Sequence, residues 1–409
     1  MRILFMGTPD LAAESLGALI AAGHEIVGVF TRADKPVGRK QVLTAPPVKQ
    51  LAVQHGIPVW QPATLRDGEA EKVFRALQPD LVVVVAYGRI LPPALLHIAP
   101  LGCINLHVSL LPKYRGSAPI QWAVLNGDKE TGVTIMQLDE GCDTGDILLV
   151  EPVAIGPETT SGELFDEVSA IGAKTLVRAV ELLGAGQLRP RPQDSALATQ
   201  APPLTKEMAR FTFAETAAHL HNWVRGMNPW PVAFFEQDGK KIKVLASRTA
   251  ENPAHAAPGT ILSLKPLTVA CAEGALQLLT VTPEGGRPME GTAWAAGRRL
   301  HAGDSLLPRA ISLCGRCSTR NRPDTPTLCW TPNCAVAPRR CPRGRRRLPP
   351  ASSIRYWSAG ICLTGCLAAT SKSRSRNWTR RYARSCAPGW RRPALWRCRC
   401  RPPSTNRSS

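Results

Sequence analysis

The sequence predicts an α/β protein with a Rossmann-like, mostly parallel sheet, followed by a small β-barrel domain and a basic tail. Three observations support this order. Apolar, β-branched runs alternate with stretches of helical spacing through about the first 180 residues. A proline-rich segment without either period follows at 187–203, and short apolar runs separated by Gly, Pro or Asn come after it. Strand and helix alternation favours a parallel sheet covered by helices.

The first domain, placed at residues 1–189, contains five predicted strands and five predicted helices. Runs rich in Val, Ile and Leu predict strands at 2–6, 25–31, 80–86, 103–107 and 133–138. Apolar residues at helical spacing predict helices at 11–22, 47–55, 68–77, 120–126 and 161–183. In such sheets ligands bind beyond the carboxyl ends of the strands, so we expect the functional site there.

A linker is placed at 190–207 and a second domain at 208–307. A short helix near 213–226 is predicted to open this domain. Short strands are predicted at 233–236, 241–247, 260–264, 267–272 and 276–281. Five short strands with turn residues between them favour a small antiparallel barrel.

The tail at 308–409 differs from the rest of the chain in charge. It carries 22 Arg, one Lys and a single acidic residue, Asp324, so it contributes +22 to a chain of net charge +20 and leaves residues 1–307 near −2. The tail has no periodic apolar face and is predicted to be disordered, because it buries too little apolar surface to offset chain entropy. Our hypothesis is that it is an out-of-frame translation of GC-rich DNA. A basic RNA-binding extension is one alternative, and a zinc site formed by Cys314, Cys317, Cys329 and Cys334 is another.

Three cysteines in residues 1–307 favour a reduced protein without a disulfide framework: Cys103, Cys142 and Cys271. The chain begins directly with a predicted strand, and its apolar runs are too short to cross a bilayer. We therefore expect a soluble, cytoplasmic protein that acts as a monomer without a membrane partner.

The segment 103–116, with the sequence CINLHVSLLPKYRG, is the richest in chemically useful side chains. Alternation along a strand puts Asn105 and His107 on one face. A Gly- and Asp-rich loop within 133–147 can bring Asp143 beside the imidazole. An amide, an imidazole and a carboxylate suffice for acyl transfer to an amine: the imidazole takes the amine proton, the carboxylate stabilises the charged imidazole, and the amide holds the oxyanion.

Each of these residues also has an ordinary structural interpretation when it is taken alone. An Asn near a strand end is often a turn or cap residue, and a single His is often a core side chain. Asp143 fits a turn between Gly141 and Gly145. Residue types alone therefore leave the catalytic interpretation open.

The order of these motifs resembles the folate-dependent formyltransferases, in which Asn, His two residues later, SLLP and a distant Asp in a DTGD-like loop recur. The resemblance implies that Asn105, His107 and Asp143 are catalytic, that 10-formyltetrahydrofolate is the formyl donor and that no metal is needed. It also implies that the SLLP loop contacts the folate. The implied folate-binding residues are Ser109, Leu110, Leu111 and Pro112 in that loop, with Ala86, Tyr87, Gly88 and Ile90 in the wall of the pterin pocket.

Within these enzymes the sequence resembles the methionyl-tRNA formyltransferases rather than the glycinamide ribonucleotide formyltransferases. The first strand-to-helix turn, GTPD at 7–10, has one glycine and lacks a Gly-rich phosphate loop. The inserted loop DKPVGRK at 34–40 and the NPWP motif at 228–231 match as well. The resemblance implies initiator methionyl-tRNA as a partner beside folate, with Lys35, Arg39 and Lys40 contacting the tRNA. It also implies that the second domain at 208–307 is an OB-like domain that helps to hold the tRNA.

Two residues depart from the pattern of the methionyl-tRNA formyltransferases, and two other functions remain as alternatives. Pro203 stands where Lys is common, and Thr212 stands where an acidic residue or Asn is usual, which puts tRNA affinity in question. Another folate-linked formyl transfer or hydrolysis is one rival, and it would favour a small amine over methionyl-tRNA. A catalytically silent tRNA-binding protein is the other, and it would bind tRNA without turnover.

Overall fold

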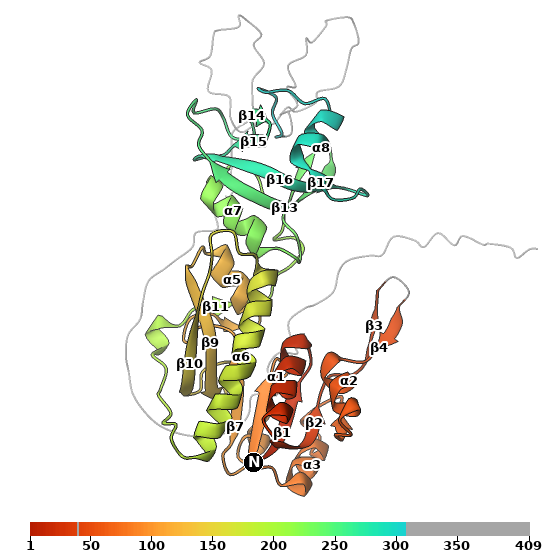
Figure 1. Cartoon of the computed structure of the whole chain (residues 1–409), viewed down its shortest axis with the longest axis vertical. Helices are drawn as coiled ribbons and strands as arrows, with labels where there is room; N and C mark the ends of the chain where they lie inside the picture. Colours follow the sequence, from red (N-terminus) through yellow and green to blue (C-terminus); the bar gives the residue numbers. More distant parts are fainter. Residues whose placement is uncertain (39–40, 308–409) are drawn as a thin grey trace, which may run out of the picture. The chain divides into compact units, whose positions relative to one another are not determined.

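The computed structural model describes residues 1–38 and 41–307 (Figure 1). Arg39, Lys40 and the whole tail at 308–409 lie outside the described residues. The predictions that concern the tail, including its disorder, the zinc site and the RNA-binding extension, fall on that part of the chain. In the described ranges no helix is long and apolar enough to cross a membrane.

The first domain is built on a seven-stranded sheet, which confirms the mostly parallel α/β prediction. Its strands β7, β6, β1, β2 and β5 run parallel, and β9 and β10 add antiparallel pairs at one side. In spatial order the strands are β10 (Ile147–Ala154), β9 (Glu130–Gln137), β7 (Cys103–His107), β6 (Leu81–Val85), β1 (Arg2–Gly7), β2 (Glu25–Phe30) and β5 (Val59–Trp60).

Helices cover both faces of this sheet because its strands are apolar on both sides. One core joins the sheet to α1, α2, α5 and α6, and a second core joins it to α3 and α4. The helices are α1 (Asp10–Ala21), α2 (Pro47–Gln54), α3 (Glu69–Leu77), α4 (Pro93–Leu96), α5 (Pro119–Leu125) and α6 (Ser161–Gly184). A capping box formed by Thr160 and Glu163 starts α6, because each side chain bonds the backbone N–H of the other residue.

Strand β10 was missing from the sequence prediction. It is the edge strand of the sheet and contains Pro152, which has no N–H for a ladder bond. Proline is tolerated only where one side of a strand needs no partner, so a proline-containing run gives a weak strand signal. The hairpin β3 (Lys35–Val37) and β4 (Val42–Thr44) was also unpredicted as strands.

The second domain is β-rich, as predicted, and its strands form an antiparallel sheet of order β12-β13-β16-β15-β14, with β17 paired to β16. A separate core surrounds Phe213, Phe235 and Trp294. The OB-like closure of this sheet into a barrel stays a prediction. The elements are α7 (Ala217–Gly226), β12 (Phe234–Gln237), β13 (Lys240–Ala250), β14 (Ile261–Leu264), β15 (Leu267–Ala270), β16 (Ala275–Pro283), β17 (Met289–Glu290) and α8 (Gly291–Gly297).

The segment predicted as a linker is anchored along the first domain rather than spanning a gap. A 3₁₀ turn, η1 (Ser195–Leu197), is followed by β11 (Gln200–Ala201), which pairs in parallel with β8 (Arg115–Gly116). An isolated bridge also joins Arg191 to Ile147 of β10. These pairings bring the segment beside the end of β7, where the candidate site lies.

Candidate active site

Strand β7 carries the two polar side chains that the sequence predicted to share a face. Ile104 and Leu106 belong to the core shared with α6, and Asn105 and His107 line a cavity of about 700 Å³, to which Leu106 also contributes. Both polar residues are buried, with 9% and 6% of their surface exposed. Strand β7 lies between β6 and β9, so its backbone is held on both sides. The strand alternation thus places an amide and an imidazole in the same cavity.

A backbone carbonyl determines which nitrogen of His107 carries the hydrogen. The ring nitrogen Nε2 lies 2.9 Å from the carbonyl oxygen of Tyr114, and this oxygen can only accept a hydrogen bond. The neutral imidazole therefore carries its hydrogen on Nε2 and leaves a lone pair on Nδ1. Burial lowers the pKa of His107, while the nearby Asp143 carboxylate opposes that shift. Burial thus favours the neutral ring, with Nδ1 as a proton acceptor.

Asp143 lies beside this free nitrogen, as the sequence predicted. Its Oδ2 is 3.7 Å from His107 Nδ1 and accepts a hydrogen bond of 2.8 Å from the backbone N–H of Gly116. The residue has a positive φ of 55°, which an Asp tolerates better than most residues. Thr144 donates to both carboxylate oxygens of Asp139 and closes the loop that carries Asp143.

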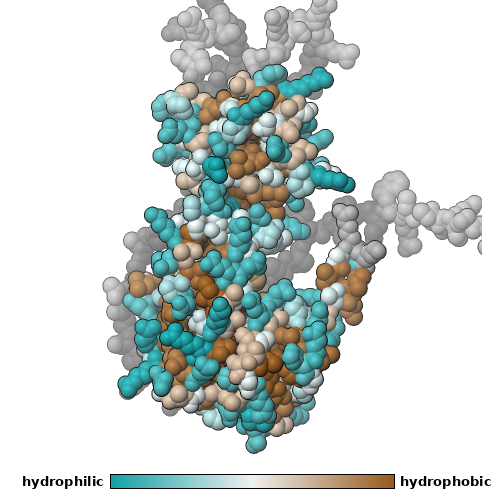
Figure 2. Space-filling view, viewed as in Figure 1, coloured by the Kyte–Doolittle hydropathy of each residue, from teal (hydrophilic) through white to brown (hydrophobic). Residues whose placement is uncertain are grey.

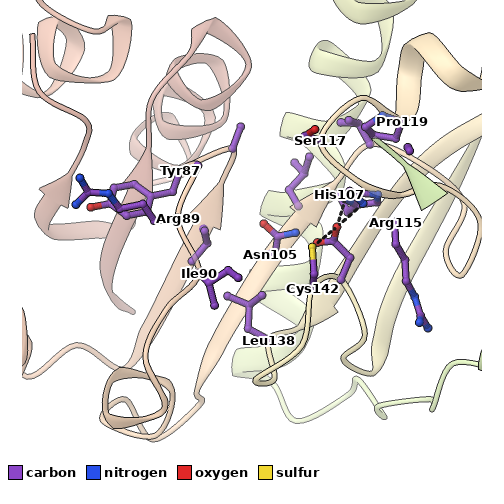
Figure 3. Close-up of a pocket in the computed structure, with 18 of the residues that line it drawn as sticks. Tyr87, Arg89, Ile90, Asn105, His107, Arg115, Ser117, Pro119, Leu138 and Cys142 are labelled. Carbon is purple, nitrogen blue, oxygen red and sulfur yellow. Dashed lines mark hydrogen bonds and ion pairs between the residues drawn. The ribbon is translucent and has the colours of Figure 1, made fainter. Parts of the chain in front are cut away.

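The opposite wall of the cavity contains the residues predicted to form the pterin pocket. Ala86, Tyr87, Gly88 and Ile90, which follow β6, all line the cavity. In Figure 3 Asn105 lies between Ile90 and Cys142, and His107 lies beside Cys142 on the side away from Tyr87. The cavity therefore has an apolar side suited to a flat ring and a polar end suited to a transferred group.

The hydroxyl of Tyr87 is buried and has no hydrogen-bond partner within residues 1–38 and 41–307. Burial also raises the pKa of Tyr87. In the same part of the chain, no group of three or more His, Cys, Asp or Glu side chains is arranged to hold a metal ion.

The SLLP loop is placed behind the cavity rather than in its lining. Ser109 donates a 2.7 Å hydrogen bond to the carbonyl of Lys113, and the N–H of Leu111 donates to Thr134 Oγ1 at 3.2 Å. Leu110 lines a separate cavity of about 230 Å³. Ser109, Leu110, Leu111 and Pro112 are all outside the lining of the large cavity. Contact between the SLLP loop and folate stays a prediction that this cavity does not support. The loop leads into the turn that brings the Tyr114 carbonyl to His107.

Of the three predicted tRNA-binding residues, the structure describes Lys35, which lies exposed on the β3–β4 hairpin. Three large apolar side chains are also exposed there, and they form the hairpin patch, brown in Figure 2: Val37, Val42 and Leu43. The base of the hairpin is fixed by Asp34, which accepts 2.9 Å hydrogen bonds from Lys49 Nζ. The exposed hairpin patch thus follows a base that Asp34 and Lys49 hold.

Two further segments contribute to the cavity and were missed by sequence reasoning. Arg115, Gly116 and Ser117 come from the turn after the SLLP loop, and 200–203 come from the segment predicted as a linker. Pro203, singled out for its effect on tRNA, therefore lies in the cavity wall. The RG pair at 115–116 follows SLLPKY directly, but no local pattern indicates that 200–203 reaches the same place.

Comparisons with known proteins match both folded parts. A model described as formyl transferase matches residues 1–180, and one described as formyl transferase, C-terminal domain matches residues 203–299. A methionyl-tRNA formyltransferase of Methylobacterium sp. (strain 4-46) is 47% identical over 310 residues, which cover 75% of this chain and 99% of the relative. Another from Stutzerimonas stutzeri (strain A1501) is 50% identical over 291 residues, covering 71% and 92%.

A solved structure shares the fold at low identity. The N-formyltransferase of Helicobacter canadensis, in complex with folinic acid and dTDP-3-aminofucose, superposes with a TM-score of 0.54 and 17% identity. The match covers 68% of this chain and 98% of that protein. This likeness supports the architecture described above.

Proposed function

Because this chain belongs to the formyl transferase family, we propose that it transfers the formyl group of 10-formyltetrahydrofolate to the α-amino group of methionyl-tRNA(fMet), giving formylmethionyl-tRNA for translation initiation. The observation that carries this proposal is the convergence of Asn105, His107 and Asp143 at the polar end of one cavity. The 47% identity with a methionyl-tRNA formyltransferase supports the choice of amine.

The geometry gives Asn105, His107 and Asp143 different roles in the proposed transfer. The methionyl amine attacks the formyl carbon, and the Asn105 amide donates to the formyl oxygen as negative charge develops on it. His107 accepts the amine proton at Nδ1, because Nε2–H is already bonded to the Tyr114 carbonyl. The resulting imidazolium faces the Asp143 carboxylate. The bond from the formyl carbon to N10 then breaks, and N10 receives the proton, which leaves tetrahydrofolate and the formylated amine.

The wall of Ala86, Tyr87, Gly88 and Ile90 is proposed to hold the pterin ring. These residues follow β6 at the carboxyl edge of the sheet, and most of the cavity around them is apolar. A flat ring inserted there leaves its N10 side toward Asn105.

The tRNA is proposed to contact the β3–β4 hairpin and the second domain. Lys35 supports phosphate contact, and the hairpin patch supports packing against a base or ribose. We assign the same proposed role to Arg39 and Lys40, and we propose domain boundaries at 1–189 and 208–307 with 190–207 between them. We further propose a cytoplasmic monomer, which accords with a trio drawn from a single chain.

The test is formyl transfer by the purified full chain from 10-formyltetrahydrofolate to charged initiator methionyl-tRNA. His107→Ala should abolish transfer, whereas His55→Ala, which changes an exposed histidine at the end of α2, should leave it unchanged. A small amine such as free methionine serves as a competing acceptor. Preference for the small amine, or tight tRNA binding without transfer, would reject the proposed activity.

A further inference from the structure

Gln193 connects the segment between the domains to the loop that carries Asp143. Its side-chain Nε2 donates hydrogen bonds to two carbonyl oxygens of that loop, 3.0 Å to Asp143 and 2.7 Å to Gly145. Its Oε1 accepts bonds from Arg115 Nε at 3.2 Å and from the second guanidinium nitrogen Nη2 at 2.8 Å. All four bonds join positions at least 48 residues apart in sequence. One amide thus ties together three segments that meet at the cavity.

Arg115 reinforces this connection from the other side. Its side chain is buried, with 6% of the residue exposed, and the structure pairs it with the Gln193 amide oxygen. The backbone of Arg115 and Gly116 pairs with Gln200 and Ala201 of β11. The N–H of Gly116 in turn donates to Asp143 Oδ2. The segment 193–201 therefore restrains Asp143 at its backbone through Gln193 and at its carboxylate through β8.

The restraint matters because the loop has no regular structure of its own at Asp143. The residue sits at a positive φ, and its carboxylate contacts His107 at 3.7 Å without a direct short hydrogen bond. A small rotation of the loop would separate the Asp143 carboxylate from the imidazolium that forms during transfer. Misplacement of a catalytic group by about 1 Å can lower a rate by about 100-fold.

We propose that Gln193 is a positioning residue for formyl transfer: its amide holds the 139–146 loop so that the Asp143 carboxylate faces Nδ1 of His107. The inference rests on the proposed function and adds to it a residue from outside the motifs that suggested that function. Gln193 touches no reacting atom. Its effect passes through Asp143.

Two substitutions separate the two halves of the Gln193 side chain. Gln193→Glu keeps an oxygen for Arg115 and removes the donor to the two carbonyls, whereas Gln193→Leu removes both. Gln187→Leu is the matched control, because Gln187 is exposed and lies in the same segment. We expect kcat to fall by about 10- to 100-fold in both Gln193 variants, with KM for both substrates within about twofold, and no change in the control.

A double substitution tests whether the effect passes through Asp143. In an Asp143→Asn background, Gln193→Leu should lower kcat by less than about threefold more, since the group it positions has already lost its charge. Multiplicative losses would overturn the proposal. So would a Gln193→Glu variant with wild-type kcat, because the bond to Arg115 would then be the one that matters.

The pH profile gives a readout that a purely structural role would not move. The groups facing the His107 imidazole are the Asp143 carboxylate from the β9–β10 loop and the Tyr114 carbonyl from the turn before strand β8. When Asp143 moves away, His107 loses the charge that raises its pKa, so the acid limb of kcat should shift to lower pH in both Gln193 variants. An unshifted limb beside a lowered kcat would overturn the proposal.

Amide hydrogen exchange tests the restraint without any activity. The N–H of Gly116, which donates to Asp143, should exchange faster in both Gln193 variants than in Gln187→Leu and the parent chain. Unchanged exchange would overturn the inference. If the parent chain fails to formylate methionyl-tRNA, the proposed function fails, and the exchange measurement still decides whether Gln193 holds the loop.

Discussion

Replacing Asp143 with Asn removes one charge from the site and leaves the remaining geometry intact. The Asn side-chain oxygen can accept the Gly116 N–H, and Asn tolerates the positive φ of 55° at this position. The carboxylate is 3.7 Å from Nδ1 of His107, and at that distance two unit charges attract by about 4.5 kcal/mol at an effective dielectric constant of about 20.

That attraction is a ceiling for the stabilisation of the imidazolium formed during transfer. It corresponds to about three powers of ten in rate. The Asp143 side chain keeps 15% exposure, so water screens part of it, and we expect kcat to fall between about 100- and 1,000-fold. The measurement is single-turnover formyl transfer to methionyl-tRNA with both substrates saturating.

The midpoint of the pH–rate profile of Asp143→Asn should shift in a definite direction. Burial lowers the pKa of His107 and Asp143 raises it, so removing the carboxylate lowers that pKa further. The rate requires the neutral imidazole and rises with pH through this pKa, so its midpoint should move to lower pH. Asp146→Asn, in the same loop but outside the cavity lining, is the control. A kcat within twofold of the parent, with an unmoved midpoint, would refute the reasoning.

Three further outcomes are expected. Asn105→Ala removes the oxyanion donor and should lower single-turnover transfer by about 100- to 1,000-fold, with folate binding by fluorescence little changed. In Gly116→Ala the new Cβ would lie 2.7 Å from a carbonyl oxygen of β11, whereas in Gly186→Ala the space is open. Thermal melts should show that Gly116→Ala destabilises the protein by about 2 kcal/mol more than Gly186→Ala. Equal melting temperatures of the two variants would contradict this. Lys49→Met, which releases the base of the β3–β4 hairpin, should raise KM for methionyl-tRNA about 3- to 10-fold without raising KM for folate, whereas Lys72→Met on α3 should raise neither.

The site shows where local pattern suffices and where it does not. Strand periodicity alone put Asn105 and His107 on one face, and in the structure both side chains of the buried β7 line the same cavity. The same reasoning did not predict β10, because Pro152 weakens the strand pattern in that segment. A proline is accommodated there only because β10 lies at the edge of the sheet. The same reasoning also gave no indication that the segment predicted as a linker, 190–207, pairs with β8.

The sequence by itself determined most of the succession of strands and helices, although not β10 or the β3–β4 hairpin. It also determined the β-rich second domain and the chemical types of the proposed catalytic trio. These depend on periodicity and on motifs a few residues long, which are set within one element. Only the tertiary structure decided that Tyr114 fixes the His107 tautomer, that the SLLP loop stands behind the cavity and that Gln193 reaches the Asp143 loop. The bonds of Gln193 to the Asp143 loop join positions 48 and 50 residues apart and depend on how formed elements pack, which no local pattern encodes. The Tyr114 carbonyl lies only seven residues from His107, but its direction depends on how the turn between them folds.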